Sequence, residues 1–242
     1  MSARAPGLIM PSTKPRFYYG WVIVAVATLA LAVSNGLSIG GIPVFYKSIR
    51  EDFVLSGAIA PDRAESFIAF AATLTFLFSG LISPLAGWLI QKFPLKNLML
   101  VGCGLLGGGL LLHATTHSEF AVYAARILMG ISLGFVGVLP TVVLVSNWFV
   151  DRRGAALGIL LTGTSIGGAV IPPIATPLIE RFGWRTSMIA LSGVIWGILA
   201  PAILLLVRSR PPLVDPMSES IGAAETHGAL PKTDGITFGH AI

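Results

Sequence analysis

Charged residues in this chain fall into clusters, and six long intervals between the clusters carry few or none of them. Each interval is close to the roughly 20 residues that an α-helix needs to cross about 30 Å of hydrocarbon. Hydrophobic residues make up 54% of the chain and charged residues only 11%, whereas a typical soluble domain is about 25% charged. The pattern predicts an all-α, polytopic membrane protein with six transmembrane helices, over residues 21–45, 67–90, 98–116, 120–146, 154–179 and 186–207.

Basic residues are divided unevenly between the two sides of this topology. Nine lie on one side and five on the other, which fits the positive-inside rule with both termini in the cytoplasm. Topology thus explains the net charge of +5, and no nucleic-acid partner is expected. We predict a multi-pass protein of the plasma (inner) membrane, with a cytoplasmic tail over 1–16, a helical bundle over 17–210, and a flexible cytoplasmic linker or tail over 211–242.

Two enzyme motifs occur inside the apolar intervals without their structural context. The nucleophile turn G-x-S-x-G of hydrolases is matched by Gly163, Ser165 and Gly167. The dinucleotide fingerprint G-x-G-x-x-G is matched by Gly102, Gly104 and Gly107. No strand is predicted before either motif, and no acidic residue lies within any interval. Cys103 is the only cysteine and no Cys/His spacing suggests a metal site, so we expect no enzyme activity, cofactor or metal ion.

Glycine and proline are unusually frequent within the predicted spans. Glycine pairs four residues apart allow helix backbones to approach closely and predict a compact bundle; they are Gly36/Gly40, Gly104/Gly108, Gly130/Gly134, Gly154/Gly158 and Gly163/Gly167. Pro172 and Pro173 each remove a backbone donor, so we expect the fifth span to bend near Ile171. Two interpretations stay open, a static kink and a hinge on which one bundle rocks.

Arg126 is the only basic residue within a predicted span. At steps of four, four, three and four it shares one helix face with Gly130, Gly134, Gly137 and Thr141. An arginine above a groove of glycines is placed to contact a small polar or anionic solute. Alternatively, its side chain snorkels to the nearer aqueous end of the helix.

Further polar residues are candidates for the same binding site or for gating. Asn35 and Ser38 lie in the first span, and the amide of Asn35 is the costlier of the two to leave unpaired. Lys92 and Lys96 follow the second span, while Arg152 and Arg153 precede the fifth. Such cations usually fix orientation, but they can also bond carbonyls at helix C-termini and hold a cytoplasmic gate shut.

Several stretches together resemble the N-terminal half of a major facilitator superfamily transporter, closest to the monocarboxylate and oxalate/formate branch. FYYGW before the first span resembles the entry signature of that branch, and NWFVDRRGAALGI and ERFGWR resemble its later loops. RILMGISLG fits the R-x-x-x-G pattern of the superfamily. The resemblance covers residues 17–210 and implies that Arg126 takes part in substrate binding or proton coupling.

The loop after the second span resembles the superfamily motif G-x-x-x-D-[RK]-x-G-x-[RK]. It keeps Gly87, Lys92 and Lys96, but Gln91 replaces the acid and Pro94 replaces the second glycine. The resemblance therefore implies a weakened charge interaction between the two halves of a transporter.

These observations lead to one functional prediction and one alternative. The prediction is a secondary active transporter of a small organic solute, monocarboxylate-like and plausibly anionic, working by alternating access. The chain would be its N-terminal half, and its partners would be the solute, membrane lipid, and a missing C-terminal half or a second copy. Substrate contacts are assigned to Arg126, Asn35, Ser38, Gly130, Gly134 and Thr141. Gating or structural roles are assigned to Gly87, Gln91, Lys92, Lys96, Arg152, Arg153, Gly163, Gly167, Pro172 and Pro173. The alternative is a non-transporting six-span scaffold or a degenerate transporter fragment.

Overall fold

The computed structural model describes residues 18–149 and 152–208, and the predicted tails over 1–16 and 211–242 lie outside the described residues. Within the described ranges the chain is helical and contains no strand, which confirms the all-α prediction there. The elements are α1 (Gly20–Asn35), η1 (Gly36–Gly40), α2 (Pro43–Leu55), η2 (Pro61–Arg63), α3 (Ala64–Lys92), α4 (Leu95–Thr115), α5 (Glu119–Val136), α6 (Val138–Ser146), α7 (Arg153–Val194), η3 (Ile195–Leu199) and α8 (Ala200–Leu206).

Five helical segments of the described chain are long and apolar enough to cross a membrane. They are Gly20–Leu55, Pro61–Lys92, Leu95–Thr115, Glu119–Ser146 and Arg153–Leu206. The last is 54 residues long and contains the fifth predicted span and all but the last residue of the sixth. Six separate segments are therefore not seen, and the number of membrane crossings stays a prediction.

The long last segment is interrupted at Gly183. This residue has φ 78° and ψ 162°, whereas α7 keeps helical angles through Pro172 and Pro173. Glycine accepts a positive φ because it has no Cβ, and proline, with φ fixed near about −65°, remains compatible with a helix. We predicted a bend near Ile171, but the backbone keeps helical angles there, and the one interruption within α7 lies twelve residues later, between the two predicted spans.

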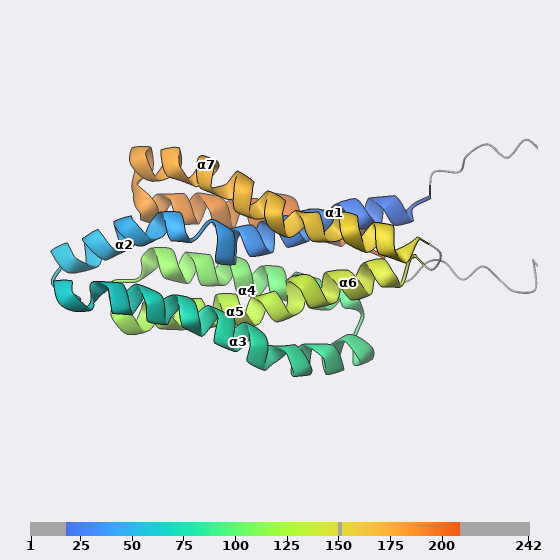
Figure 1. Cartoon of the computed structure of the whole chain (residues 1–242), viewed down its shortest axis with the longest axis horizontal. Helices are drawn as coiled ribbons and strands as arrows, with labels where there is room; N and C mark the ends of the chain where they lie inside the picture. Colours follow the sequence, from blue (N-terminus) through green and yellow to red (C-terminus); the bar gives the residue numbers. More distant parts are fainter. Residues whose placement is uncertain (1–17, 150–151, 209–242) are drawn as a thin grey trace, which may run out of the picture. The chain divides into compact units, whose positions relative to one another are not determined.

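The two ends of the helical bundle are identified by contacts between distant residues. At one end, the terminal end, Tyr19 Oη donates to the Leu206 carbonyl oxygen and Trp148 Nε1 to that of Arg208, both at 2.8 Å. At the other, the distal end, Arg185 Nη1 lies 2.6 Å from Asp52 Oδ2, and Nη2 donates to the Thr116 carbonyl oxygen at 3.0 Å. The chain therefore reverses at Gly183 and α8 returns to the terminal end, as Figure 1 shows.

Glycines set the closest helix packing, between α1 and α7. A Cβ added to Gly163 would lie 2.5 Å from the Thr28 carbonyl oxygen, and one added to Gly167 would overlap the Ala32 carbonyl oxygen. Side-chain-free positions of this kind let two helices approach backbone to backbone in lipid, where packing rather than hydrophobic burial drives association. The pair Gly163/Gly167 is thus part of the helix interface.

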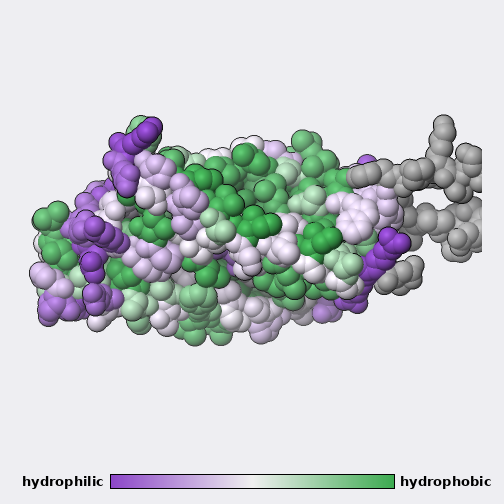
Figure 2. All heavy atoms as spheres, turned by 45° about the horizontal axis from the view of Figure 1, so that its top comes forward, coloured by the Kyte–Doolittle hydropathy of each residue, from purple (hydrophilic) through white to green (hydrophobic). Residues whose placement is uncertain are grey.

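The bundle exposes much apolar surface. Only 17% of the most apolar window of Pro61–Lys92 and 28% of that of Arg153–Leu206 is buried, against 67% for Gly20–Leu55. Figure 2 shows hydrophobic residues over the middle of the visible face and hydrophilic residues gathered toward its ends. Large exposed apolar patches on a soluble monomer are rare, so this surface suits contact with lipid or with further protein.

Candidate functional site

A cavity of about 420 Å³ lies between α1–η1, α3 and the junction of α5 with α6. Its polar wall consists of Asn35, Ser79 and Ser83. The rest of the wall is Ile39, Leu133, Gly134, Gly137, Val138, Leu139 and Val142. Ser79 lies 15 residues after the start of α3 and 13 before its end, or roughly 20 Å from either end at 1.5 Å per residue. The cavity therefore sits at the mid-length of three apolar segments.

Irregular backbone lies on two sides of this cavity. η1 is a five-residue π-helix between α1 and α2, in which Gly41 N donates to the Gly36 carbonyl oxygen at 2.6 Å. Gly137, with φ −81° and ψ −147°, separates α5 from α6. Breaks at mid-span are tolerated only where protein or water satisfies the freed backbone groups, and π-helical turns are frequent at functional sites.

The two polar candidates of the first span differ in their surroundings. Asn35 lines the cavity, and its Nδ2 donates to the Leu31 carbonyl oxygen at 3.4 Å. Ser38 is buried at 2% exposure, and its Oγ has no hydrogen-bond partner among the described residues. An unpaired buried hydroxyl costs about 1–3 kcal/mol, so a water or solute oxygen beside Ser38 would be favoured.

Arg126 is enclosed in the bundle at 1% exposure, so its side chain does not snorkel to water. Its guanidinium carbon lies 5.4 Å from the ring centroid of Tyr46 on α2, within cation–π range. Its Nε and Nη1 have no hydrogen-bond partner among the described residues. No ion pair joins it to an acid in that part of the chain. A buried cation with unused donors is costly unless an anion or water reaches it.

The other residues predicted to contact solute on the Arg126 face contact protein instead. A Cβ on Gly130 would lie 2.5 Å from the Thr75 carbonyl oxygen, and one on Gly134 would overlap Ile82, so both glycines pack against α3. Gly134 also borders the cavity. Thr141 is buried, and its Oγ1 donates to the Gly137 carbonyl oxygen at 2.8 Å. The structure thus brings Asn35 and Gly134 together at the cavity, and encloses Arg126, Gly130 and Thr141 elsewhere in the bundle.

Gln91 and Lys92, two of the predicted gating residues, lie at the terminal end. A hollow of about 600 Å³ lies beside Gln91, Lys92 and Asn147, where the α3–α4 turn meets the end of α6. Lys92 Nζ lies 3.9 Å from the Trp88 ring centroid, and Gln91 Nε2 donates to the Gly87 carbonyl oxygen at 3.4 Å.

The basic residues that precede α7 also lie at the terminal end. Arg153 Nε donates to Ser146 Oγ at 3.0 Å, which joins the start of α7 to the end of α6. Arg152, beside it, is exposed. The end of the fourth segment and the start of the fifth are therefore tied together here by a polar contact.

Two other features do not form a reactive centre. Ser165 is exposed within the helical part of α7, so the strand-to-helix turn of a hydrolase is absent at this position.

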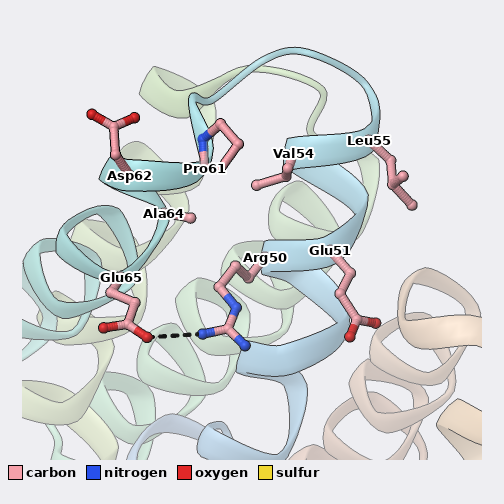
Figure 3. Close-up of a pocket in the computed structure, with 8 residues that line it drawn as sticks. All are labelled: Arg50, Glu51, Val54, Leu55, Pro61, Asp62, Ala64 and Glu65. Carbon is pink, nitrogen blue, oxygen red and sulfur yellow. Dashed lines mark hydrogen bonds and ion pairs between the residues drawn. The ribbon is translucent and has the colours of Figure 1, made fainter.

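A second cavity, of about 490 Å³, lies at the distal end between α2 and α3. There Arg50 Nη1 lies 3.2 Å from Glu65 Oε1, and Glu51 and Asp62 complete its charged rim (Figure 3).

Sequence reasoning missed two residues that shape the site. Tyr46, which faces Arg126, lies beyond the predicted end of the first span because that segment continues to Leu55. Gly137 was assigned to a helix face, yet it ends α5. The sequence feature that could have indicated this break is Pro140. A proline is well placed in a first helical turn, where its missing N–H is not needed, and it lies there in α6.

Comparison with known proteins shows which family this chain resembles. The sequence profile of the Major Facilitator Superfamily matches residues 16–232. The mouse protein Monocarboxylate transporter 11 is 28% identical over 85% of this chain and 44% of its own length. Bovine Monocarboxylate transporter 1 is 23% identical over 89% of this chain and 41% of its own. The Fujikurins efflux protein of Gibberella fujikuroi is 30% identical over 62% of this chain and 32% of its own.

The profile match covers most of the chain, including both sides of the mid-length cavity and the Arg126 region. The aligned part spans less than half of the length of each of the three relatives. Helical architecture, apolar segments and profile agree, and the chain belongs to the Major Facilitator Superfamily.

Proposed function

We propose that this chain is the N-terminal half of a secondary active transporter that moves a small, monocarboxylate-like organic solute by alternating access. The observation that carries the proposal is the cavity at the mid-length of three apolar segments, walled by Asn35, Ser79 and Ser83 and flanked by η1 and Gly137. Transporters of this kind bind solute near the bilayer midplane, where helices are discontinuous.

In the proposed topology the chain crosses the membrane six times, with Gly183 between the fifth and sixth crossings. Support comes from the 54-residue length of the last segment. At 1.5 Å per residue it would extend for roughly 80 Å if straight, far more than a bilayer's hydrocarbon thickness. The reversal at Gly183 divides this segment into two helical stretches, each of a length typical of a membrane-spanning helix.

The terminal end is proposed to face the cytoplasm. All six acidic residues of the described ranges lie at the distal end, namely Glu51, Asp52, Asp62, Glu65, Glu119 and Glu180. The terminal end carries Lys92, Lys96, Arg152, Arg153 and Arg208 without an acid in those ranges. In this topology nine Lys and Arg residues of the sequence belong to the terminal side and five to the distal side, and such an excess is the usual mark of the cytoplasmic face. We take the membrane that this protein spans to be the plasma (inner) membrane.

Arg126 is proposed to meet the solute when the bundle opens. Its unused Nε and Nη1 donors make it the strongest candidate for an anionic group, and Tyr46 holds it in place from α2. Asn35 would contact the solute's polar part within the cavity, with Ser38 behind it. Lys92, Lys96, Arg152 and Arg153 would close the terminal end, and the Gly163/Gly167 interface with Pro172 and Pro173 would permit α7 to move against α1.

The names of the mouse and bovine relatives suggest monocarboxylates as the solute class, and the chain's share of their length suggests that a second half completes the pathway. That half would come from further sequence or from a second copy. The exposed faces of α3 and α7, which are little buried in this chain, would then meet that second half or lipid.

Uptake of radiolabelled short monocarboxylates into proteoliposomes tests the proposal, using the protein expressed from its complete reading frame. Asn35→Ala should lower uptake by roughly 3- to 10-fold, since loss of one hydrogen bond costs about 0.5–1.5 kcal/mol. Asn97→Ala is the matched control, because Asn97 is exposed in the first turn of α4 and far from the cavity. Equal uptake by both variants would contradict the assigned site. Absence of flux for any solute tested would favour the non-transporting scaffold.

A further inference from the structure

A third cavity, of about 500 Å³, lies at the distal end between the first turns of α3 and α5. Its lining includes Arg63, Phe67, Phe70, Glu119, Phe120 and Tyr123. The cavity is far from the mid-length site and plays no part in the proposed transport pathway. It lies where two apolar segments begin, which is the level at which lipid headgroups surround a membrane protein.

The charged groups of this cavity form a loose pair. Arg63 Nη2 lies 3.8 Å from Glu119 Oε1, too far for a hydrogen bond, and the Arg63 side chain is 70% exposed. Tyr123 Oη donates to Glu119 Oε1 at 2.6 Å, which orients the carboxylate. The cavity thus presents one cation and one fixed anion a few ångströms apart, with donors on Arg63 still open to solvent.

Aromatic rings form the wall beside this pair. The Phe70 and Tyr123 rings lie edge to face with centroids 5.1 Å apart, and the Phe67 and Tyr123 centroids are 5.5 Å apart. Faces of such rings attract ammonium groups, most strongly quaternary ones. Phe70 and Phe120 are 52% and 85% exposed, so apolar surface continues outward from the cavity.

We propose that this cavity binds the headgroup of a zwitterionic phospholipid from the surrounding bilayer. The phosphate would lie against Arg63, the ammonium group against Glu119 and the rings of Phe67, Phe70 and Tyr123, and the acyl chains along Phe70 and Phe120. The separated charges of the pair match the separated charges of choline or ethanolamine phosphates. An anionic lipid without an ammonium group would bring its charge toward Glu119 and gain nothing from the rings.

The distal end holds a natural comparison. The cavity of Figure 3 is of similar size, about 490 Å³, and also contains an arginine–glutamate pair, Arg50 and Glu65 at 3.2 Å. Its lining residues include no aromatic ring. The closer ion pair and the missing rings leave no site for an ammonium group, so Arg50 serves as the matched control for Arg63.

Native mass spectrometry of the detergent-purified full-length protein tests the proposal. Phosphatidylcholine and phosphatidylethanolamine should bind at least roughly tenfold more tightly than phosphatidylglycerol of the same chains. Arg63→Gln and Glu119→Gln should each abolish that preference, while Arg50→Gln should keep it. Soluble phosphocholine should compete poorly because it lacks acyl chains, and strong competition by it would exclude a lipid as the occupant.

Two further results would overturn the proposal. One is equal affinity of the native protein for phosphatidylglycerol and the zwitterionic lipids. The other is an unchanged lipid preference in both Arg63→Gln and Tyr123→Leu, with folding of each variant verified by its thermal unfolding profile. A stronger effect of Tyr123→Leu on phosphatidylcholine than on phosphatidylethanolamine is expected, since the quaternary ammonium depends more on the rings.

Discussion

Gly167→Ala should destabilise the bundle markedly, while Gly168→Ala should leave its stability nearly unchanged. A Cβ on Gly167 would overlap the carbonyl oxygen of Ala32, which belongs to the backbone of α1 and cannot move aside as a side chain would. A Cβ on Gly168 would meet nothing within 4 Å. Overpacking of a close interface costs about 1–3 kcal/mol, and separation of α1 from α7 would also disturb the wall of the mid-length cavity.

Thermal unfolding of the two variants in the same detergent provides the measurement. Both add one methyl group to adjacent positions of α7, so helix propensity and hydrophobicity change equally. A lowered unfolding midpoint for Gly167→Ala alone would support the backbone-to-backbone interface. Equal midpoints would show that α1 and α7 are not packed as closely as the structure has them.

Arg126→Met should strongly lower solute uptake without lowering the stability of the protein. The guanidinium is enclosed with two unpaired nitrogen atoms and has no acidic partner among the described residues. Replacement of such a buried charge by an apolar side chain of similar length is often neutral or stabilising. A lost charge-assisted contact to an anionic solute, at about 1.5–3 kcal/mol, would lower uptake by roughly 10- to 100-fold or more.

Arg185→Met is the matched control for this prediction. Arg185 is partly exposed, pairs with Asp52 at 2.6 Å and donates to the Thr116 carbonyl oxygen at 3.0 Å, so its role is to tie three elements at the distal end. We expect a loss of roughly 1 kcal/mol of stability, because exposed pairs are screened by solvent, with little change in uptake per folded molecule. Unchanged uptake in Arg126→Met would remove Arg126 from the solute pathway, whatever its effect on stability.

The helical segments themselves were predictable from the sequence because hydrophobicity alone determines them. The second interval, 67–90, corresponds to α3, and the third, 98–116, to α4, with ends shifted by a few residues. Charges at Glu180, Arg181 and Arg185 placed a gap between the last two intervals, and the chain reverses there at Gly183. Charged residues avoid the hydrocarbon region, so their positions mark segment ends.

The interruptions within segments could not be predicted in the same way. Hydropathy does not distinguish the π-helical turn at Gly36–Gly40 from a regular helix, because the same apolar residues occupy both. Gly137 was equally compatible with close packing and with a break, and contacts with the rest of the bundle decide between them. Arg126 was singled out as unusual, yet its burial beside Tyr46 depends on α2, most of which lies beyond the predicted end of the first span at residue 45.

Thiol labelling at Ser79 tests most directly whether water and solute reach the cavity halfway along α3. Cys103, the only cysteine and a buried one, is first replaced by alanine. Cysteine is then introduced at Ser79, which lines the cavity, or at Leu77, which is 57% exposed on nearly the opposite face of α3. A water-soluble thiol reagent reacts with the thiolate, which forms in water but not in lipid.

Membrane vesicles containing Ser79→Cys should be labelled by such a reagent, although residue 79 lies roughly 20 Å from either end of its helix. Leu77→Cys should resist labelling, because lipid covers that face. If short monocarboxylates slow the labelling of Ser79→Cys, the solute occupies the cavity as well. Equal resistance of the two positions, or equal reactivity, would contradict a water-filled site at the centre of this bundle.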